Sequence, residues 1–129
     1  MPDDIDAEVI LDEILLHDDR YARQAYYFIM EALKHTLQNL QVHRHVTGQE
    51  LSLGIRDYAI QQFGMIARLV FEQWGITRTR DFGEIVFNLV TAGLMRKTDE
   101  DSVDDFNDVY DFEKEFETNY RIEVDKSSL

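Results

Sequence analysis

The chain has 129 residues, and its 26 aspartates and glutamates outnumber its 13 lysines and arginines, so the formal net charge is −13. This length suits one domain, and a hydrophobic content of 44% argues against global disorder. Because the sequence has no cysteine, disulfides, a cysteine nucleophile and thiolate metal sites are excluded. The acidic start lacks the basic and then apolar pattern of a secretory signal, and no apolar run approaches ~20 residues, so we expect a cytoplasmic protein without a membrane partner.

The charge is unevenly distributed along the chain. Residues 1–20 carry a net charge of −7, residues 21–98 carry +3, and residues 99–129 carry −9. The centre is therefore mildly basic, and the acidic residues gather at the two ends. Solvated acidic ends keep a protein soluble, and they can also mask a basic centre or influence the choice of partner.

Two helices are predicted in the first third of the chain. Apolar residues over 5–16 follow a helical stripe, with acidic residues in the first turn, where they favour the positive end of the helix dipole. The pattern over 20–40 is stronger, because apolar residues recur at three- and four-residue steps without Gly or Pro. The pattern breaks over 41–47, and residues 43–46 are a candidate short strand.

Helix-capping residues divide the next part of the chain. Thr47 and Glu50 have the spacing of a capping box, which predicts a helix over 49–63. Gly64 permits a change of direction before a second helix over 65–74.

A third helix of the centre is predicted after a turn. Gly75 stands where a left-handed, helix-ending residue is expected. Asp81 and Glu84 have the spacing of another cap, which predicts a helix over 82–92 that ends at Gly93. The apolar stripes of these helices predict seven core residues: Phe28, Leu33, Ile55, Phe63, Trp74, Ile85 and Leu89.

The last third of the chain has a β-like pattern. We expect strands over 94–98 and 109–116, joined by an acidic loop, because aromatic and acidic residues alternate along the second segment. A helix fits this segment and the residues after it as well, since three aromatic residues stand four apart: Phe112, Phe116 and Tyr120.

These elements follow the order of a winged helix-turn-helix. We therefore predict a mainly α, winged-helix-like domain over 1–120 with a C-terminal β-hairpin, followed by a frayed tail over 121–129. A strand over 43–46 would complete the small sheet. An all-α bundle is the alternative fold.

Several blocks of the sequence resemble one protein family. The blocks are HVTGQEL at 45–51, QFG at 62–64, WGI at 74–76, DFGEIVFNLV at 81–90, AGLMRKTDEDS at 92–102, DF at 105–106 and YDFE at 110–113. Together they are similar to a small family of conserved bacterial proteins of unknown function, seen chiefly in planctomycetes and verrucomicrobia. The resemblance covers roughly residues 8–116 and implies one intact domain, but it supplies no activity, cofactor or catalytic residue.

Three motifs that suggest known chemistry have simpler interpretations. The sequence DFG at 81–83 matches the magnesium motif of kinases, but the chain lacks a glycine-rich phosphate loop and is too short for that fold, so we interpret the motif as a helix cap. His43 and His45 would face one side of a strand, but without a third ligand they predict no transition-metal site. The acidic run over 99–105 lacks the glycine and glutamate positions of an EF-hand, which predicts a solvated loop.

Enzymatic and nucleic-acid functions are the weaker alternatives. No nucleophile elbow, Walker A or Rossmann pattern occurs, so we expect no cofactor, and a small enzyme of unknown reaction is the third choice. A winged-helix regulator would read bases from the helix over 82–92, which has no Lys or Arg, and the acidic isoelectric point near 4.5 disfavours nucleic acid. Four basic residues that flank this helix are the candidate phosphate contacts of that alternative: Arg78, Arg80, Arg96 and Lys97. One continuous basic face formed by these four would favour DNA.

The preferred hypothesis is a non-enzymatic protein–protein interaction or assembly module. If residues 109–116 form a strand, one face of it carries an acidic stripe that would attract a basic partner with a salt-dependent association rate. The candidate partner-binding residues are Asp111, Glu113 and Glu115.

Overall fold

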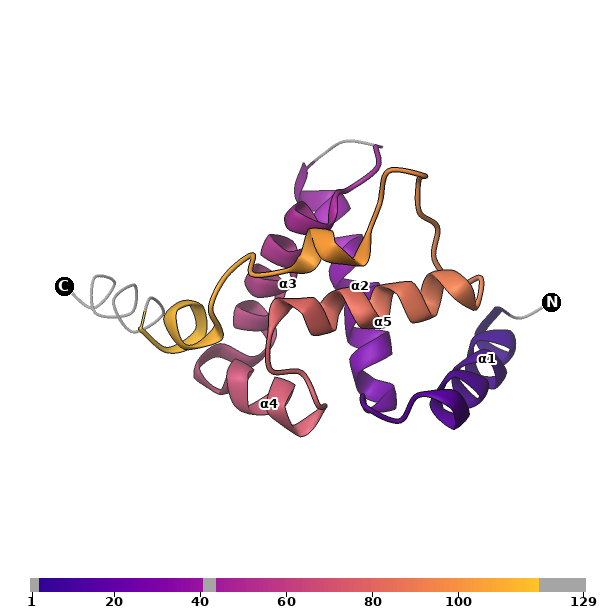
Figure 1. The fold of residues 1–129 in the computed structure, drawn as a ribbon. Helices are drawn as coiled ribbons and strands as arrows, with labels where there is room; N and C mark the ends of the chain where they lie inside the picture. The colour runs from indigo at the N-terminus through magenta and orange to yellow at the C-terminus, as the bar shows by residue number, and fades with distance from the viewer. Residues whose placement is uncertain (1–2, 41–43, 119–129) are drawn as a thin grey trace.

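The computed structural model describes residues 3–40 and 44–118, and the chain is mainly helical over these ranges (Figure 1). Its α-helices are α1 (Asp3–His17), α2 (Arg23–Leu40), α3 (Gly48–Phe63), α4 (Ala67–Gln73) and α5 (Thr79–Thr91). Two 3₁₀ turns, η1 (Gly64–Ile66) and η2 (Val103–Phe106), and one π-helical turn, η3 (Lys114–Thr118), complete the described elements. None of the helices in these ranges is long and apolar enough to cross a membrane.

The prediction of a mainly α fold is confirmed, but the β-hairpin is wrong. Residues 94–98 follow α5 without forming a strand, and 109–116 run into a helical turn. The candidate strand over 43–46 is also wrong over 44–46, while residue 43 and the predicted tail over 121–129 lie outside the described part of the chain.

Helix α5 is the central element of the fold. It crosses the middle of the molecule in Figure 1 and packs against α2, α3 and η2. Three of its apolar side chains, Phe82, Ile85 and Leu89, are fully buried. The helix therefore supports the core rather than presenting an open face to solvent.

Four of the seven predicted core residues are buried: Phe28, Ile55, Ile85 and Leu89. The other three pack partly buried against the core: Leu33, Phe63 and Trp74.

An aromatic cluster around Phe71 joins α4 to the rest of the core. The fully buried Phe71 ring lies 5.7 Å from Phe28, 5.4 Å from Phe82 and 5.5 Å from Phe116, measured between ring centroids. These edge-on geometries are favourable for aromatic pairs. Rings from α2, α4, α5 and η3 thus meet at one place, which ties the C-terminal segment to the helical core.

Three of the predicted helix ends are confirmed. The Thr47 hydroxyl accepts from the Glu50 backbone N–H at 3.1 Å, and Glu50 accepts from the Thr47 N–H at 3.0 Å, which is the predicted capping box. Gly75 and Gly93 have φ angles of 88° and 87°, in the left-handed region that favours glycine at helix ends.

The predicted start of α5 is wrong by three residues. The helix begins at Thr79, so Asp81 lies inside its first turn rather than at the capping position. The Asp81 carboxylate reaches back and accepts from the backbone N–H groups of Thr77 and Arg78, at 2.9 and 3.2 Å. An acidic residue in the first turn stabilises the positive end of the helix by the same means as a cap. The predicted stabilising role of Asp81 therefore holds, but its predicted position in the helix is wrong.

The second predicted strand is helical because its aromatic residues are spaced for one buried helical face. Phe112 and Phe116 stand four residues apart, and only 4% and 1% of their surfaces are exposed. Two ion pairs hold this segment in place. Arg56 on α3 lies 2.8 Å from Glu115, and Arg68 on α4 lies 3.0 Å from Glu117.

Candidate functional site

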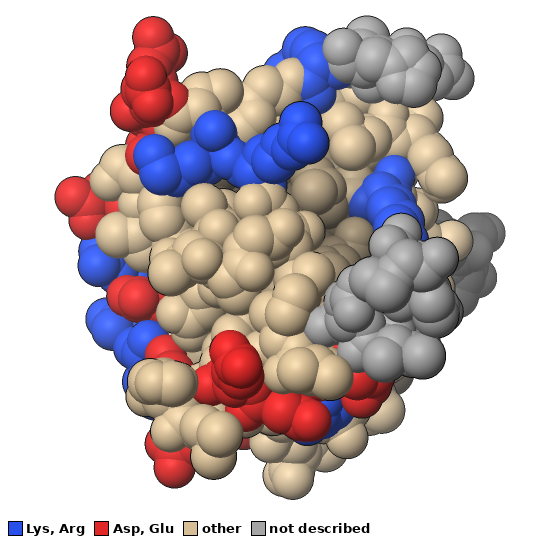
Figure 2. All heavy atoms as spheres, turned by 90° about the vertical axis from the view of Figure 1, so that its right-hand side faces the viewer, with Lys and Arg blue, Asp and Glu red and all other residues tan. Residues whose placement is uncertain are grey.

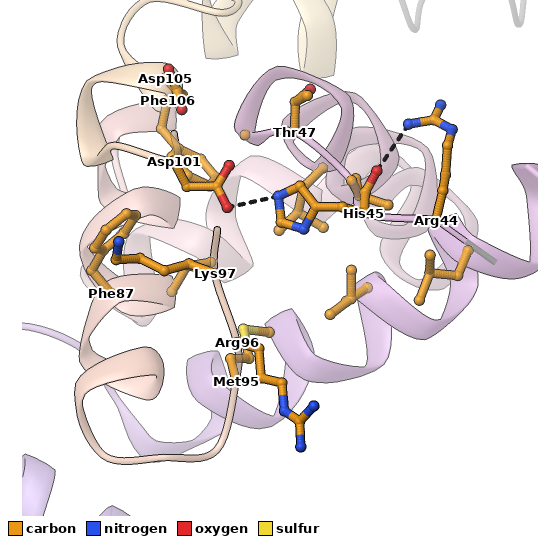
Figure 3. A pocket seen from close by; sticks show the side chains of 16 residues that line it. Arg44, His45, Thr47, Phe87, Met95, Arg96, Lys97, Asp101, Asp105 and Phe106 are labelled. Atoms are coloured by element: carbon orange, nitrogen blue, oxygen red, sulfur yellow. Dashed lines mark hydrogen bonds and ion pairs between the residues drawn. The ribbon is translucent and has the colours of Figure 1, made fainter. Parts of the chain in front are cut away.

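A pocket opens between the end of α2, the start of α3, α5 and the segment that follows α5 (Figure 3). Its volume is about 150 Å³. A space of this size accommodates roughly one benzene-sized ring. The lining is mainly apolar and includes Leu33, Leu37, Val46, Leu51, Val86, Phe87, Met95 and Phe106.

Arg96 and Lys97 line one side of this pocket. Neither forms an ion pair with any residue of the described ranges, and the Lys97 ammonium donates only to the Thr98 carbonyl, at 3.2 Å. In Figure 3 the Arg96 guanidinium points away from the apolar lining. Such long side chains cover apolar surface with their stems and keep their charges in water.

His45 and Asp101 form the opposite boundary of the pocket. His45 Nε2 lies 2.7 Å from Asp101 Oδ2, and the same carboxylate oxygen accepts from the Thr98 N–H at 2.7 Å (Figure 3). Burial acts to raise the pKa of Asp101, but the hydrogen bonds from Thr98 and His45 outweigh it and lower that pKa. The pair therefore joins the segment before α3 to the segment before η2.

Arg44 lies beside the pocket, and its charge is already neutralised. Its guanidinium makes two hydrogen bonds to the Glu50 carboxylate, at 3.0 and 2.6 Å. These bonds, together with the N–H of Thr47, lower the pKa of Glu50 to about 2. Arg44 thus stabilises the capping box at the start of α3 and leaves little positive charge for a ligand.

The histidine pair proposed from the sequence is only partly described. His43 lies outside the described residues, and His45 pairs with Asp101 instead of a second histidine. Over 3–40 and 44–118, no group of three or more His, Asp or Glu side chains could hold a metal ion. The absence of a transition-metal site stays a prediction.

The four candidate phosphate-binding residues fall into two pairs at the two ends of α5. Arg78 and Arg80 lie at the start of α5, whereas Arg96 and Lys97 follow its end, and a helix of 13 residues is about 20 Å long. Arg80 is also neutralised, because it pairs with Glu84 at 3.2 Å and with Asp104, which lies 2.8 Å away. One continuous basic face formed by all four stays a prediction, and Arg80 adds little free charge to it.

Charges of opposite sign are separated on the side of the molecule that contains α1 and the end of α5. Figure 2 shows Lys and Arg side chains in a row along one edge of a broad uncharged area and Asp and Glu side chains along the other edge.

The predicted acidic stripe is wrong in its geometry. In a helical turn, residues two apart point in very different directions, so Asp111, Glu113 and Glu115 do not share a face. Asp111 accepts from the Lys114 N–H at 3.1 Å, and Glu115 pairs with Arg56. Glu113 is exposed, and the three carboxylates do not line up as they would along one face of a strand.

The acidic segment over 99–108 is anchored by internal partners, which differs from the solvated loop that the sequence predicts. Asp101 pairs with His45, Asp104 pairs with Arg80, and Asp105 accepts from the Ser102 N–H at 3.0 Å. These contacts place Phe106 in the core, where 3% of its surface is exposed.

Sequence reasoning missed the pocket because no single segment forms it. Its residues come from α2, the start of α3, α5 and the segment over 95–106. The adjacent bases Arg96 and Lys97 are the local signal in the sequence, where they are candidate phosphate contacts.

Comparisons with models of protein families, with curated proteins and with solved structures find no match for this chain. The resemblance to conserved planctomycete and verrucomicrobial proteins therefore stays a prediction.

Proposed function

We propose that this protein is a non-enzymatic protein-interaction or assembly module and that its partner binds at the pocket between α2, α3 and α5. The observation that carries the proposal is the open apolar hollow itself, about 150 Å³ in volume. Pockets that desolvate one apolar side chain of a partner supply much of the binding energy of protein interfaces. Phe87, Met95 and Phe106 provide aromatic and thioether surface suited to such an anchor.

The polar groups around the pocket favour binding over catalysis. A catalytic site needs a nucleophile or base that faces the substrate. Here His45 and Asp101 are bonded to each other, and Asp105 accepts from the Ser102 backbone. The cations of Arg96 and Lys97 have no carboxylate partner among the described residues, and such cations bind anionic groups.

The nucleic-acid alternative has less support. A recognition helix must project its side chains into a groove, whereas α5 directs Phe82, Ile85 and Leu89 into the core and is covered by η2. The basic residues at its two ends are separated by the length of the helix, and Arg80 is paired.

Selection from a library of short random peptides displayed on phage tests the proposal. The immobilised wild-type protein is compared with Leu37→Trp, in which a larger ring fills the pocket, and with Leu53→Trp. Leu53 is a matched control because it is 40% exposed and lies on the side of α3 opposite to Leu51.

We expect the wild type and Leu53→Trp to enrich a common peptide motif and Leu37→Trp to lose it. Circular dichroism and a thermal melt show that each variant is folded. Failure of the wild type to enrich any motif, or equal enrichment by all three proteins, contradicts a binding site in this pocket.

A further inference from the structure

We infer that the partner binds through an acidic segment, whose aromatic or leucine side chain enters the pocket while neighbouring carboxylates contact Arg96 and Lys97. The inference rests on the proposed function and specifies the chemistry of the partner. It depends on which charges of the protein are already paired, on the volume of the pocket, and on the reach of the two basic side chains.

The unpaired bases of the protein are concentrated at this pocket. Of the lysines and arginines in the described ranges, seven form ion pairs with acidic side chains: Arg20, Arg23, Lys34, Arg44, Arg56, Arg68 and Arg80. Four form none: Arg78, Arg96, Lys97 and Lys114. Two of these four are adjacent in the sequence, and both line the pocket.

The acidic side chains that line the pocket are occupied by internal donors. Asp101 is bonded to His45 and to the Thr98 N–H, each at 2.7 Å. Asp105 accepts from the Ser102 N–H at 3.0 Å. Neither carboxylate pairs with Arg96 or Lys97, so two positive charges are available beside an apolar hollow in a protein whose net charge is −13. Two bases that have no carboxylate partner among the described residues can form ion pairs with an anionic segment of the partner at this point.

The pocket sets the size of the anchor residue. A volume of about 150 Å³ suits one ring or one leucine-sized side chain and is too small for a whole helix. A carboxylate on a residue next to the anchor would stay outside the pocket, at its edge. Arg96 and Lys97 both line the pocket, and the Arg96 guanidinium points away from the apolar lining, so their charges lie outside the hollow where such a carboxylate would be (Figure 3).

A second copy of this chain is a poorer occupant than an acidic segment of another protein. Two molecules that each carry a charge of −13 repel one another, and the acidic residues at 101, 104 and 115 are already paired within the chain. A nucleic acid is also anionic, so the experiment includes it as a separate probe.

The test compares two double variants that change the net charge equally. Arg96→Glu with Lys97→Glu reverses the unpaired bases at the pocket. Arg78→Glu with Lys114→Glu reverses the two unpaired bases elsewhere in the described ranges and is the matched control. A synthetic peptide carrying the motif selected by the wild type is titrated against all three proteins by fluorescence anisotropy, at low and high salt, and a random single-stranded DNA oligonucleotide is titrated in parallel.

We expect the selected motif to contain an aromatic residue or leucine flanked by Asp or Glu. The pocket variant should bind the peptide at least about tenfold more weakly than the wild type, whereas the control variant should bind within about twofold, and the affinity for the wild type should fall with salt.

The outcomes separate the two claims. A selected motif without acidic residues, or an equal loss of affinity in both double variants, overturns the acidic-segment inference while the interaction function stands. Failure of the wild type to select any motif contradicts both. DNA binding that is lost only in the pocket variant, without peptide binding, overturns both and supports the nucleic-acid alternative.

Discussion

Tyr21 and Asp81 lie 60 residues apart in the sequence and meet in the interior, where the Tyr21 hydroxyl donates a 2.6 Å hydrogen bond to Asp81 Oδ1. The other carboxylate oxygen of Asp81 accepts from the backbone N–H groups of Thr77 and Arg78. Burial, followed by the bond to Asp81, raises the pKa of Tyr21, so the phenol stays protonated and donates. One carboxylate therefore joins the segment before α2 to the first turn of α5.

Replacing Asp81 should destabilise the protein more than replacing its partner. Asp81→Ala leaves the Tyr21 hydroxyl buried without an acceptor and removes the cap of α5, so we expect a loss of about 3 kcal/mol in the free energy of unfolding. Tyr21→Phe removes only the shared bond and should cost about 1.5 kcal/mol. Urea denaturation measures both, and equal losses would contradict the capping role of Asp81.

The central position of α5 predicts a large cost for trimming its buried face. Ile85→Ala and Leu89→Ala each remove a side chain with 0% exposure and should destabilise the fold by about 2–4 kcal/mol. Leu16→Ala is the control, because Leu16 on α1 is 83% exposed and should change stability by less than about 0.5 kcal/mol. If all three variants unfold at similar urea concentrations, α5 is not at the centre of the core.

Gly54 allows α2 and α3 to lie close together. A Cβ atom at this position would collide with the Oγ1 atom of Thr36, whose hydroxyl donates to the Ala32 carbonyl at 2.7 Å. Gly54→Ala should therefore destabilise the protein by about 2 kcal/mol, although alanine favours a helix in isolation.

A double-mutant cycle separates this clash from a general effect of the substitution. In a Thr36→Ala background the colliding oxygen is absent, so Gly54→Ala should cost clearly less than in the wild type. Additive losses would show that the two residues do not constrain each other.

The capping box of α3 should give stability a specific pH dependence. The hydrogen bonds from Arg44 and Thr47 lower the pKa of Glu50 to about 2, from its usual value of 4.5. A carboxylate whose pKa is lowered by folding stabilises the native state above its unfolded pKa, and this contribution is lost as the pH falls from 4.5 toward 2.

Glu50→Gln tests this dependence, because glutamine keeps the shape of the cap and does not titrate. The stability difference between wild type and variant should shrink by about 1 kcal/mol between these two pH values, a discounted figure since the Glu50 side chain is 34% exposed. A difference that is constant with pH would contradict the charge-assisted bond to Arg44.

The sequence was informative where local patterns determine the structure. The Thr47–Glu50 spacing places a helix start because both hydrogen bonds of the box lie within four residues. Glycines at helix ends are equally local, and Gly75 and Gly93 have the backbone conformation that was expected.

The C-terminal segment could not be assigned from its sequence because two periodicities fit it. Alternation favours a strand, and the four-residue spacing of Phe112 and Phe116 favours a helix. The choice depends on contacts far away in the sequence, with Phe71 on α4 and with Arg56 on α3. The pocket could not be predicted from the sequence for the same reason, since its lining residues come from separate segments of the chain.

The most direct test of the proposed binding site is to titrate the selected acidic peptide into ¹⁵N-labelled protein and follow the backbone amide chemical shifts. The account predicts that the largest changes occur at the pocket, at Val46, Gly48 and Lys97. Changes that cluster instead at Met65 and Leu69, which are 66% and 56% exposed at η1 and α4, would place the binding site on another surface and contradict the account.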